Sequence, residues 1–346
     1  MAWIIAAAVV AGIFALVVIV VQAGMIRTAW RMVEYTPPLN ASDAGSDSRA
    51  ESVSFKTSDG LTLNGAIFQP ADQPPRGLII FCHEFGGSRW SAMHYTEALF
   101  EAGFAIFSFD FRSHGESDPL EGYEPFHWVT RYEVDDLCSA MKFVESRPDL
   151  NELPLGMFGV SRGAGTALSV AAENKSVKAI VCESAYSCRK MMYVFSDRWH
   201  SLFGPDWLMS NLPHVHATFT LAAARLIASI RRGCRFVHLE RVLPGLRNRP
   251  VLLISGKRDN YVGPEIAQHL HENINSEKTE LWLVPKARHN QARETARDEY
   301  DERIVALFNR MDGAALKVAA REEETRQVLN ADADSAAIVQ DGSLAG

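Results

Sequence analysis

A serine flanked by two glycines is the residue whose setting best fits a nucleophile. It lies in Gly159-Val160-Ser161-Arg162-Gly163, between an apolar run that predicts a strand over 153–158 and a helical pattern that starts at Arg162. Glycines relieve crowding in a sharp strand-to-helix turn, and such a turn exposes the serine hydroxyl at the helix N-terminus. We therefore predict that Ser161 attacks a carbonyl carbon.

A serine hydroxyl is a weak nucleophile, so it needs a base, and the base needs a carboxylate that orients it. His289 follows the last predicted strand, and Asp259 follows the strand before it. Both therefore lie at carboxyl ends of strands, as Ser161 does. We predict that His289 is the general base and Asp259 its acid, with Glu183 as an alternative acid.

A second glycine-rich segment, His83-Glu84-Phe85-Gly86-Gly87, follows the strand predicted over 77–82. Such a loop can direct backbone N–H groups at a developing oxyanion. We predict an oxyanion hole made by the N–H groups of Phe85 and Arg162. The remaining candidate histidines are expected to be structural or surface residues, and no histidine–cysteine spacing predicts a zinc site: His83, His114, His214 and His216.

The elements that must position these residues follow from the apolar pattern. Val53–Thr57 and Leu61–Phe68, separated by Ser58-Asp59-Gly60, predict an antiparallel hairpin. After it, short apolar runs alternate with amphipathic segments, which predicts an α/β fold with a mostly parallel sheet covered by helices on both faces. The predicted strands are 77–82, 104–109, 153–158, 177–182, 251–255 and 280–284, and the helices are 90–102, 131–145, 162–173, 264–272 and 298–310.

One interval, residues 186–249, contains no convincing strand but has a helical stretch over 217–232. We interpret it as a cap insertion over the carboxyl edge of the sheet. Ten basic and three acidic residues make it basic, which fits either a solvated surface or a lid that faces anionic lipid head groups or an acidic substrate. Its apolar side chains either pack together or line an acyl pocket: Phe195, Trp199, Phe203, Trp207 and Leu208.

The N-terminal residues 2–26 carry no charge. At about 1.5 Å per residue they can span the ~30 Å hydrocarbon core of a bilayer as one transmembrane helix. A secretory signal peptide cleaved near Val21-Gln22-Ala23 is the alternative, although a basic segment before the apolar run is missing. Arg27 and Arg31 follow the helix and predict a cytoplasmic location for the rest of the chain. A glycan at Asn40-Ala41-Ser42 would reverse this orientation.

Composition defines four segments and excludes several function classes. We expect an anchor at 1–27, a linker at 28–52, one domain at 53–312 that includes the cap, and a disordered acidic tail at 313–346. A net charge of −7 gives no general affinity for nucleic acid, and five cysteines without a CxxC pair form no disulfide framework. No phosphate-binding glycine motif follows a strand, so we expect no cofactor.

These motifs, in this order, resemble the α/β-hydrolase superfamily near its serine-aminopeptidase and monoglyceride-lipase-like branch. The resemblance covers 53–312 and implies a Ser161–His289–Asp259 triad. It includes 109–117, which is similar to the family's D-x-R-G-H-G-x-S turn and implies structural roles for Asp110 and Arg112. Glu84 and Ser113 stand where that family has glycine, and a positive φ at 84 would strain the glutamate.

The sequence thus predicts a membrane-anchored serine hydrolase that cleaves an ester, thioester or amide through a covalent acyl-enzyme. The expected partners are a small-molecule or acyl substrate and the membrane, and the oligomeric state is left open. A serine peptidase or an acyltransferase would use the same residues. A non-catalytic binding module with the same fold is a further alternative.

Overall fold

The structure is a computed structural model that describes residues 1–36, 45–198, 205 and 214–311, with the side chains of 214 and 215 excepted. The expected acidic tail and residues 37–44 of the expected linker lie outside the described residues. The same is true of Trp199, Phe203, Trp207 and Leu208 and of the His214 side chain.

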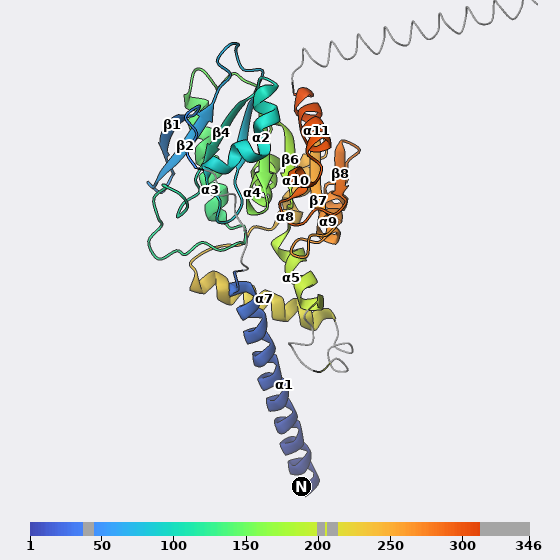
Figure 1. The fold of residues 1–346 in the computed structure, drawn as a ribbon. Helices are drawn as coiled ribbons and strands as arrows, with labels where there is room; N and C mark the ends of the chain where they lie inside the picture. Colours follow the sequence, from blue (N-terminus) through green and yellow to red (C-terminus); the bar gives the residue numbers. More distant parts are fainter. Residues whose placement is uncertain (37–44, 199–204, 206–213, 312–346) are drawn as a thin grey trace, which may run out of the picture.

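An eight-stranded sheet forms the centre of the domain (Figure 1). Its strands are β1 (Glu51–Lys56), β2 (Thr62–Phe68), β3 (Leu78–Cys82), β4 (Ala105–Phe109), β5 (Leu155–Val160), β6 (Val177–Glu183), β7 (Val251–Gly256) and β8 (Thr279–Val284). They lie in the order β1-β2-β4-β3-β5-β6-β7-β8. The first two form the predicted hairpin, β2 is antiparallel to β4, and all other pairings are parallel.

Helices cover both faces of this sheet, as predicted. One face packs against α2 (Ala92–Glu101) and α11 (Arg297–Asn309), and the other against α3 (Arg131–Ser146), α4 (Arg162–Glu173) and α9 (Pro264–Ile274). All of β3 is buried, with Ile79 in the first of these apolar layers and Ile80 in the second. Alternate residues of a strand point to opposite faces, so a strand covered on both faces is apolar throughout.

Strand β5 begins and ends two residues later than the sequence predicts. Pro154 has no N–H group to donate to the ladder, and pairing with β3 starts at Leu155. Because β5 ends at Val160, the strand leads directly into Ser161.

The predicted insertion lies between β6 and β7. It contains α5 (Cys188–Arg198), α7 (His214–Arg231), α8 (Leu239–Val242) and the 3-10 turn η3 (Leu243–Leu246). In Figure 1, α5 descends from the domain to α7, and α7 runs across the top of the N-terminal helix.

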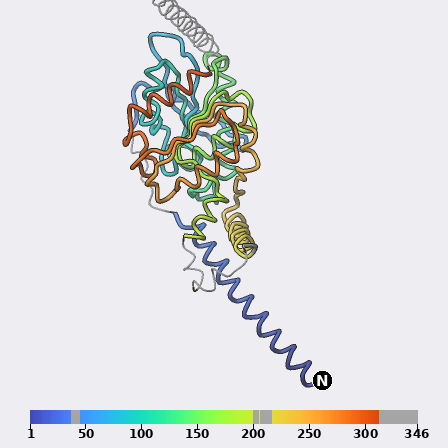
Figure 2. The backbone as a smooth tube through the Cα atoms, turned by 90° about the vertical axis from the view of Figure 1, so that its right-hand side faces the viewer, coloured from blue at the N-terminus to red at the C-terminus, as the bar shows by residue number. Residues whose placement is uncertain are grey.

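That N-terminal helix, α1 (Ala2–Glu34), projects away from the domain in both views (Figures 1 and 2). It is the one helix among the described residues that is long and apolar enough to cross a membrane, with a mean hydropathy of 3.2 over its most apolar window. It continues past residue 27, where the sequence analysis ended the anchor. Ala29 and Val33 are buried against the rest of the protein, which keeps this last part helical.

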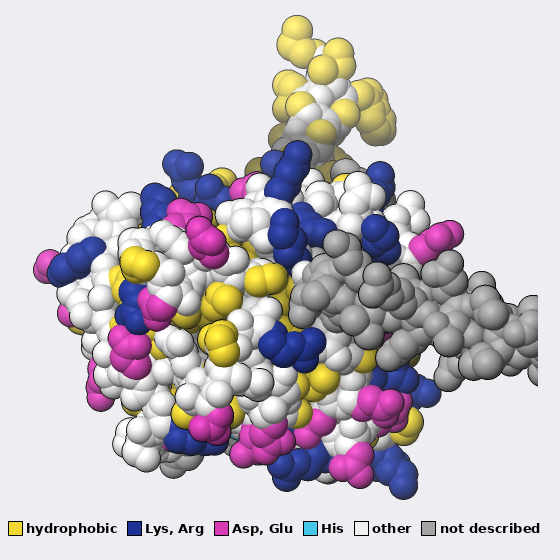
Figure 3. Space-filling model, turned by 90° about the horizontal axis from the view of Figure 1, so that it is seen from above, with side chains coloured by type: hydrophobic (Ala, Val, Ile, Leu, Met, Phe, Trp, Pro, Cys, Tyr) yellow, Lys and Arg dark blue, Asp and Glu magenta, His cyan; other side chains and the backbone are white. Residues whose placement is uncertain are grey.

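The face of the domain opposite α1 is an ordinary solvated surface. Figure 3 shows Lys and Arg beside Asp and Glu across most of it, around a small apolar patch. The described surface therefore concentrates its apolar side chains on α1 and α7, where most exposed large apolar residues lie.

Candidate active site

Ser161 occupies a strained turn between β5 and α4. Its φ of 52° and ψ of −115° lie where non-glycine residues are rare. A Cβ atom on Gly163 would overlap the carbonyl oxygens of Cys82 and His83, and one on Gly159 would overlap the backbone of Ala164. The two glycines therefore allow the chain to turn sharply between β5 and α4, as the sequence motif predicts.

The structure brings together the three residues predicted as the triad. Ser161 Oγ lies 3.0 Å from His289 Nε2, and Asp259 Oδ2 lies 2.7 Å from His289 Nδ1. A carboxylate only accepts, so Nδ1 carries the proton and the lone pair of Nε2 accepts the serine hydroxyl. This is the geometry that a general base needs.

Asp259 is held in place by the backbone that follows it. Its Oδ1 atom accepts the N–H groups of Tyr261 and Val262, each at 2.8 Å, and leaves Oδ2 for His289. The Asp259 side chain is fully buried, whereas 13% of the His289 side chain is exposed. The acid is therefore fixed, and the imidazole remains accessible beside Ser161.

Glu183, the alternative acid, serves a different purpose. Its carboxylate accepts the N–H of Ala292 at 2.9 Å and the hydroxyl of Tyr300 at 2.7 Å, and it makes no hydrogen bond to His289. Its carbonyl oxygen accepts the N–H of Ser161 at 2.8 Å. Glu183, at the end of β6, therefore links the turn that contains Ser161 to the segment that follows His289.

The predicted oxyanion loop lies at the end of β3. Neither the Phe85 N–H nor the Arg162 N–H donates to any acceptor among the described residues. Glu84 does not have a positive φ, so the strain considered for it in the sequence is absent. Its carboxyl group occupies the space that a Cβ atom on Gly87 would need. The Ser91 hydroxyl donates to its Oε1 atom at 3.3 Å.

His83 and His114 are neutral structural residues rather than bases. His83 Nε2 accepts the N–H of Phe111, which leaves Nδ1–H to donate to the Glu84 carbonyl oxygen at 2.7 Å. Burial lowers the pKa of His83 to about 3. His114 likewise donates to the Arg112 carbonyl, and burial holds its pKa well below the usual range.

The 109–117 turn is stabilised by two buried ion pairs. Asp110 binds Arg89, and Arg112 binds Asp136 at 2.6 Å. Ser113 adopts a φ of 60°, in the region that favours the glycine of the resembling motif. These contacts give Asp110 and Arg112 the structural roles that the resemblance implies.

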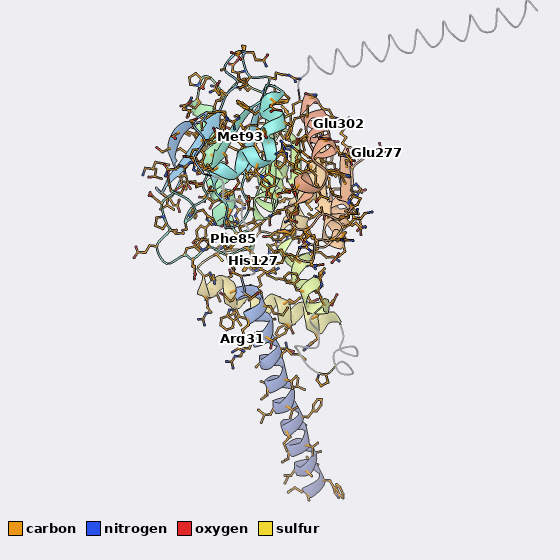
Figure 4. All side chains as sticks on the ribbon, viewed as in Figure 1. Arg31, Phe85, Met93, His127, Glu277 and Glu302 are labelled. Atoms are coloured by element: carbon orange, nitrogen blue, oxygen red, sulfur yellow. The ribbon has the colours of Figure 1, made fainter. Side chains whose placement is uncertain are left out.

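Two residues beside the triad have no counterpart in the predicted motifs. The Tyr261 ring packs edge-on against His289, with 5.2 Å between ring centroids, and His127 packs against Tyr261 at 5.9 Å. The Tyr261 hydroxyl and both ring nitrogens of His127 are buried without a hydrogen-bond partner among the described residues. Figure 4 shows Phe85 and His127 at the end of the domain nearest α7, far from Glu302.

The chain has an α/β-hydrolase fold, with Ser161, Asp259 and His289 at the ends of its strands. Within it, residues 73–232 match the family model described as serine aminopeptidase, S33. The matched segment contains Ser161 and the 83–87 loop but ends before Asp259 and His289.

Similar proteins agree with this fold. An esterase from Pyrococcus furiosus is 22% identical with a TM-score of 0.58, and the match covers 81% of this chain and 98% of that one. The uncharacterized 31.7 kDa protein of the traX–finO intergenic region of Escherichia coli is 33% identical over 133 residues, 38% of this chain and 44% of that protein. The thiohydrolase aneE of Aspergillus aculeatus is 26% identical over 132 residues, 37% and 39% of the two chains. The chain thus spans less than half the length of these two relatives.

Proposed function

We propose that the protein is a membrane-anchored serine hydrolase that cleaves an ester, thioester or amide through a covalent acyl-enzyme. The observation that carries this proposal is the continuous hydrogen-bond series from Ser161 through His289 to Asp259. A hydroxyl bonded to an imidazole whose other nitrogen is bonded to a carboxylate is an activated nucleophile.

In the proposed reaction, Ser161 Oγ attacks the carbonyl carbon while its proton passes to His289 Nε2. The N–H groups of Phe85 and Arg162 stabilise the oxyanion. His289 then returns the proton to the leaving group, and the C–X bond breaks to leave an acyl-serine. Water, deprotonated by the same imidazole, attacks the acyl-serine and releases the acid.

Apolar side chains beside the triad support an acyl or lipid-like substrate. The Phe195 ring packs against Tyr261, with 5.7 Å between centroids, and Tyr261 packs against His289. Around Phe195, apolar side chains of α1, α5 and α7 lie together with Trp128 of the loop before α3: Ala29, Met32, Val33, Met192 and Leu221. These side chains extend from the imidazole to the proposed membrane helix, so they offer an acyl chain an apolar environment.

A serine peptidase is the second candidate, since the matched family model is described as serine aminopeptidase. The thiohydrolase among the relatives favours a thioester instead. The same triad would cleave an ester, a thioester or an amide. A test with different substrates is therefore needed to distinguish these three reactions.

The proposed location is a membrane with the hydrolase domain on the cytoplasmic side. The apolar length of α1 supports the membrane, and Arg27 and Arg31 at its C-terminal end support the orientation.

Turnover of a small panel of substrates by the detergent-solubilised full chain and its Ser161→Ala variant tests this function. The panel comprises p-nitrophenyl acyl esters, acyl thioesters and aminoacyl p-nitroanilides. We expect the esters or thioesters to be hydrolysed by the unmodified chain only. Faster cleavage of the anilides would favour the peptidase, acyl transfer to an added alcohol without acid release would favour an acyltransferase, and no turnover by the folded chain would favour a binding module.

A further inference from the structure

Helix α7 of the cap is fixed to the proposed membrane helix. Gln22 Nε2 donates to Thr220 Oγ1 at 2.9 Å near one end of the contact, and Arg232 donates to Glu34 Oε2 at 2.6 and 2.8 Å at the other. Between these ends, both helices bury small residues in the same apolar cluster, namely Ala29, Ala224 and Ala228. Small residues allow helices to approach closely, so α1 and α7 form one unit.

This contact lies at the end of the apolar part of α1. The twenty residues from Ala2 to Val21 are all apolar and exposed, and at about 1.5 Å per residue they match the ~30 Å hydrocarbon core of a bilayer. Gln22 is the first polar residue of α1, and it is the residue that binds α7. A bilayer that accommodates α1 would therefore end at the level of α7.

The face of α7 that turns away from the domain is apolar. Phe219, Leu226 and Ile230 are 58%, 60% and 71% exposed, and Ala222 lies with them at helical spacing. The opposite side of the helix, including Leu221 and Ala224, is buried. Large apolar side chains at i, i+7 and i+11 form a stripe along one side of a helix, and such a stripe costs free energy in water.

Arginines lie on α1 and on the domain side of α7. Arg27 and Arg31 are exposed on α1 beside α7, and Arg231 of α7 lies over the Trp30 ring at 4.8 Å. Figure 4 shows Arg31 on α1 close to its crossing with α7. On the domain side, Arg189, Arg225 and Arg241 line a pocket between α5, α7 and α8, together with Glu240. An apolar stripe bordered by arginines is complementary to acyl chains and anionic head groups.

We propose that α7 lies in the head-group region of the bilayer, with Phe219, Leu226 and Ile230 inserted among the lipids, as a membrane contact additional to α1. This inference rests on the proposed membrane anchor. It places Phe195, which packs on Tyr261 beside His289, on the side of the protein that faces the membrane. The cap would then be fixed relative to the bilayer rather than free to move over the site.

Depth-dependent quenching in lipid vesicles tests this proposal on the full chain. Single cysteines at Leu226, Ile230, Val10 and Glu302 are labelled with bimane in a Cys138→Ser background, because the other four cysteines are buried. The vesicles contain phosphatidylcholine and phosphatidylglycerol with a doxyl group at carbon 5 or carbon 14. Val10 reports on α1, and Glu302, on α11 far from α1, is the exposed control.

We expect the 5-doxyl lipid to quench the labels at 226 and 230 severalfold more than the 14-doxyl lipid does. The label at Val10 is expected to be quenched most by the 14-doxyl lipid, and the label at 302 by neither. If Val10 is quenched while 226 and 230 behave like 302, the proposal for α7 is wrong and the anchor stands. Crosslinking between two copies through position 226 in that case would assign the stripe to a second copy of the chain. If Val10 is also unquenched, the membrane anchor itself is wrong.

Discussion

Asp259 uses its two carboxylate oxygens for different purposes: Oδ2 lies 2.7 Å from His289 Nδ1, while Oδ1 accepts the N–H groups of Tyr261 and Val262. The first contact fixes the proton of the imidazole on Nδ1. The second prevents the carboxylate from rotating. Both are needed if Nε2 is to face Ser161 with its lone pair.

Replacing Asp259 with asparagine should therefore abolish the base without unfolding the protein. The amide can turn its NH₂ group toward Nδ1, which then loses its proton and leaves the proton on Nε2. We expect kcat for an ester substrate to fall about 10³–10⁴-fold with little change in melting temperature. A variant that keeps more than about a tenth of the wild-type kcat would contradict the assignment of Asp259 as the acid.

The turn that contains Ser161 lies so close to the end of β3 that position 163 must be glycine. A methyl group there would overlap the backbone carbonyls of Cys82 and His83, which cannot move without disturbing the sheet. We expect Gly163→Ala to lower the free energy of unfolding by about 3 kcal/mol and to remove activity. Gly24→Ala is the matched control, since nothing lies within 4 Å of a Cβ atom there. Equal melting temperatures for the two variants would show that the turn is not tightly packed.

The carboxyl group of Glu84 lies against Gly87 and near Ser91, the residue that precedes α2. It is therefore placed to support the loop rather than to repel an oxyanion. We expect Glu84→Gln, which keeps the shape and removes the charge, to leave kcat/KM for an ester close to the wild-type value. A rise of about tenfold or more in kcat/KM would mean that the charge opposes the transition state.

Glu183 makes stability depend on pH. Burial raises its pKa from 4.5 to about 7, against the hydrogen bonds from Ala292 and Tyr300 that lower it. Between these two pH values the folded state binds more protons at this site than the unfolded state, so its contribution to the free energy of unfolding falls as pH rises.

Glu183→Gln removes this titration. We expect the melting temperature of the variant, relative to the wild type, to increase steadily from about pH 4.5 to about pH 7 and then level off. Melting curves at half-unit pH steps in one detergent measure it. A constant difference across that range would show that Glu183 does not change its charge there.

Much of the fold follows from local patterns in the sequence. The β3 segment is apolar at every position, which predicts burial on both faces, and Ser58-Asp59-Gly60 predicts the turn that joins β1 and β2. The triad could be placed because each of its members follows a strand, and parallel strands bring their carboxyl ends to one edge. The topology brings the three side chains close together, and at that distance they form the hydrogen bonds of the triad.

Contacts between segments far apart in the chain could not be predicted in this way. The support that Glu183 gives to both Ser161 and Ala292 depends on the side-by-side placement of β5, β6 and the 289–292 loop. No local pattern indicates that Tyr261 packs on His289, because an aromatic residue after a strand fits many environments. Likewise, the apolar period of α7 is typical of a core helix, and only its position across α1 reveals that one side is exposed.

Labelling with a fluorophosphonate tests the central claim most directly, because this reagent reacts with a serine that a neighbouring base activates. The detergent-solubilised full chain is compared with Ser161→Ala, His289→Ala and Ser113→Ala. Ser113 also has a positive φ, but its hydroxyl has no histidine partner in the part of the chain that the structure describes, so its variant is the matched control. We predict labelling of the unmodified chain and of Ser113→Ala, weak labelling of His289→Ala, and none of Ser161→Ala. A folded chain that takes no label, or a Ser161→Ala variant that still does, would contradict the assignment of Ser161 as the nucleophile.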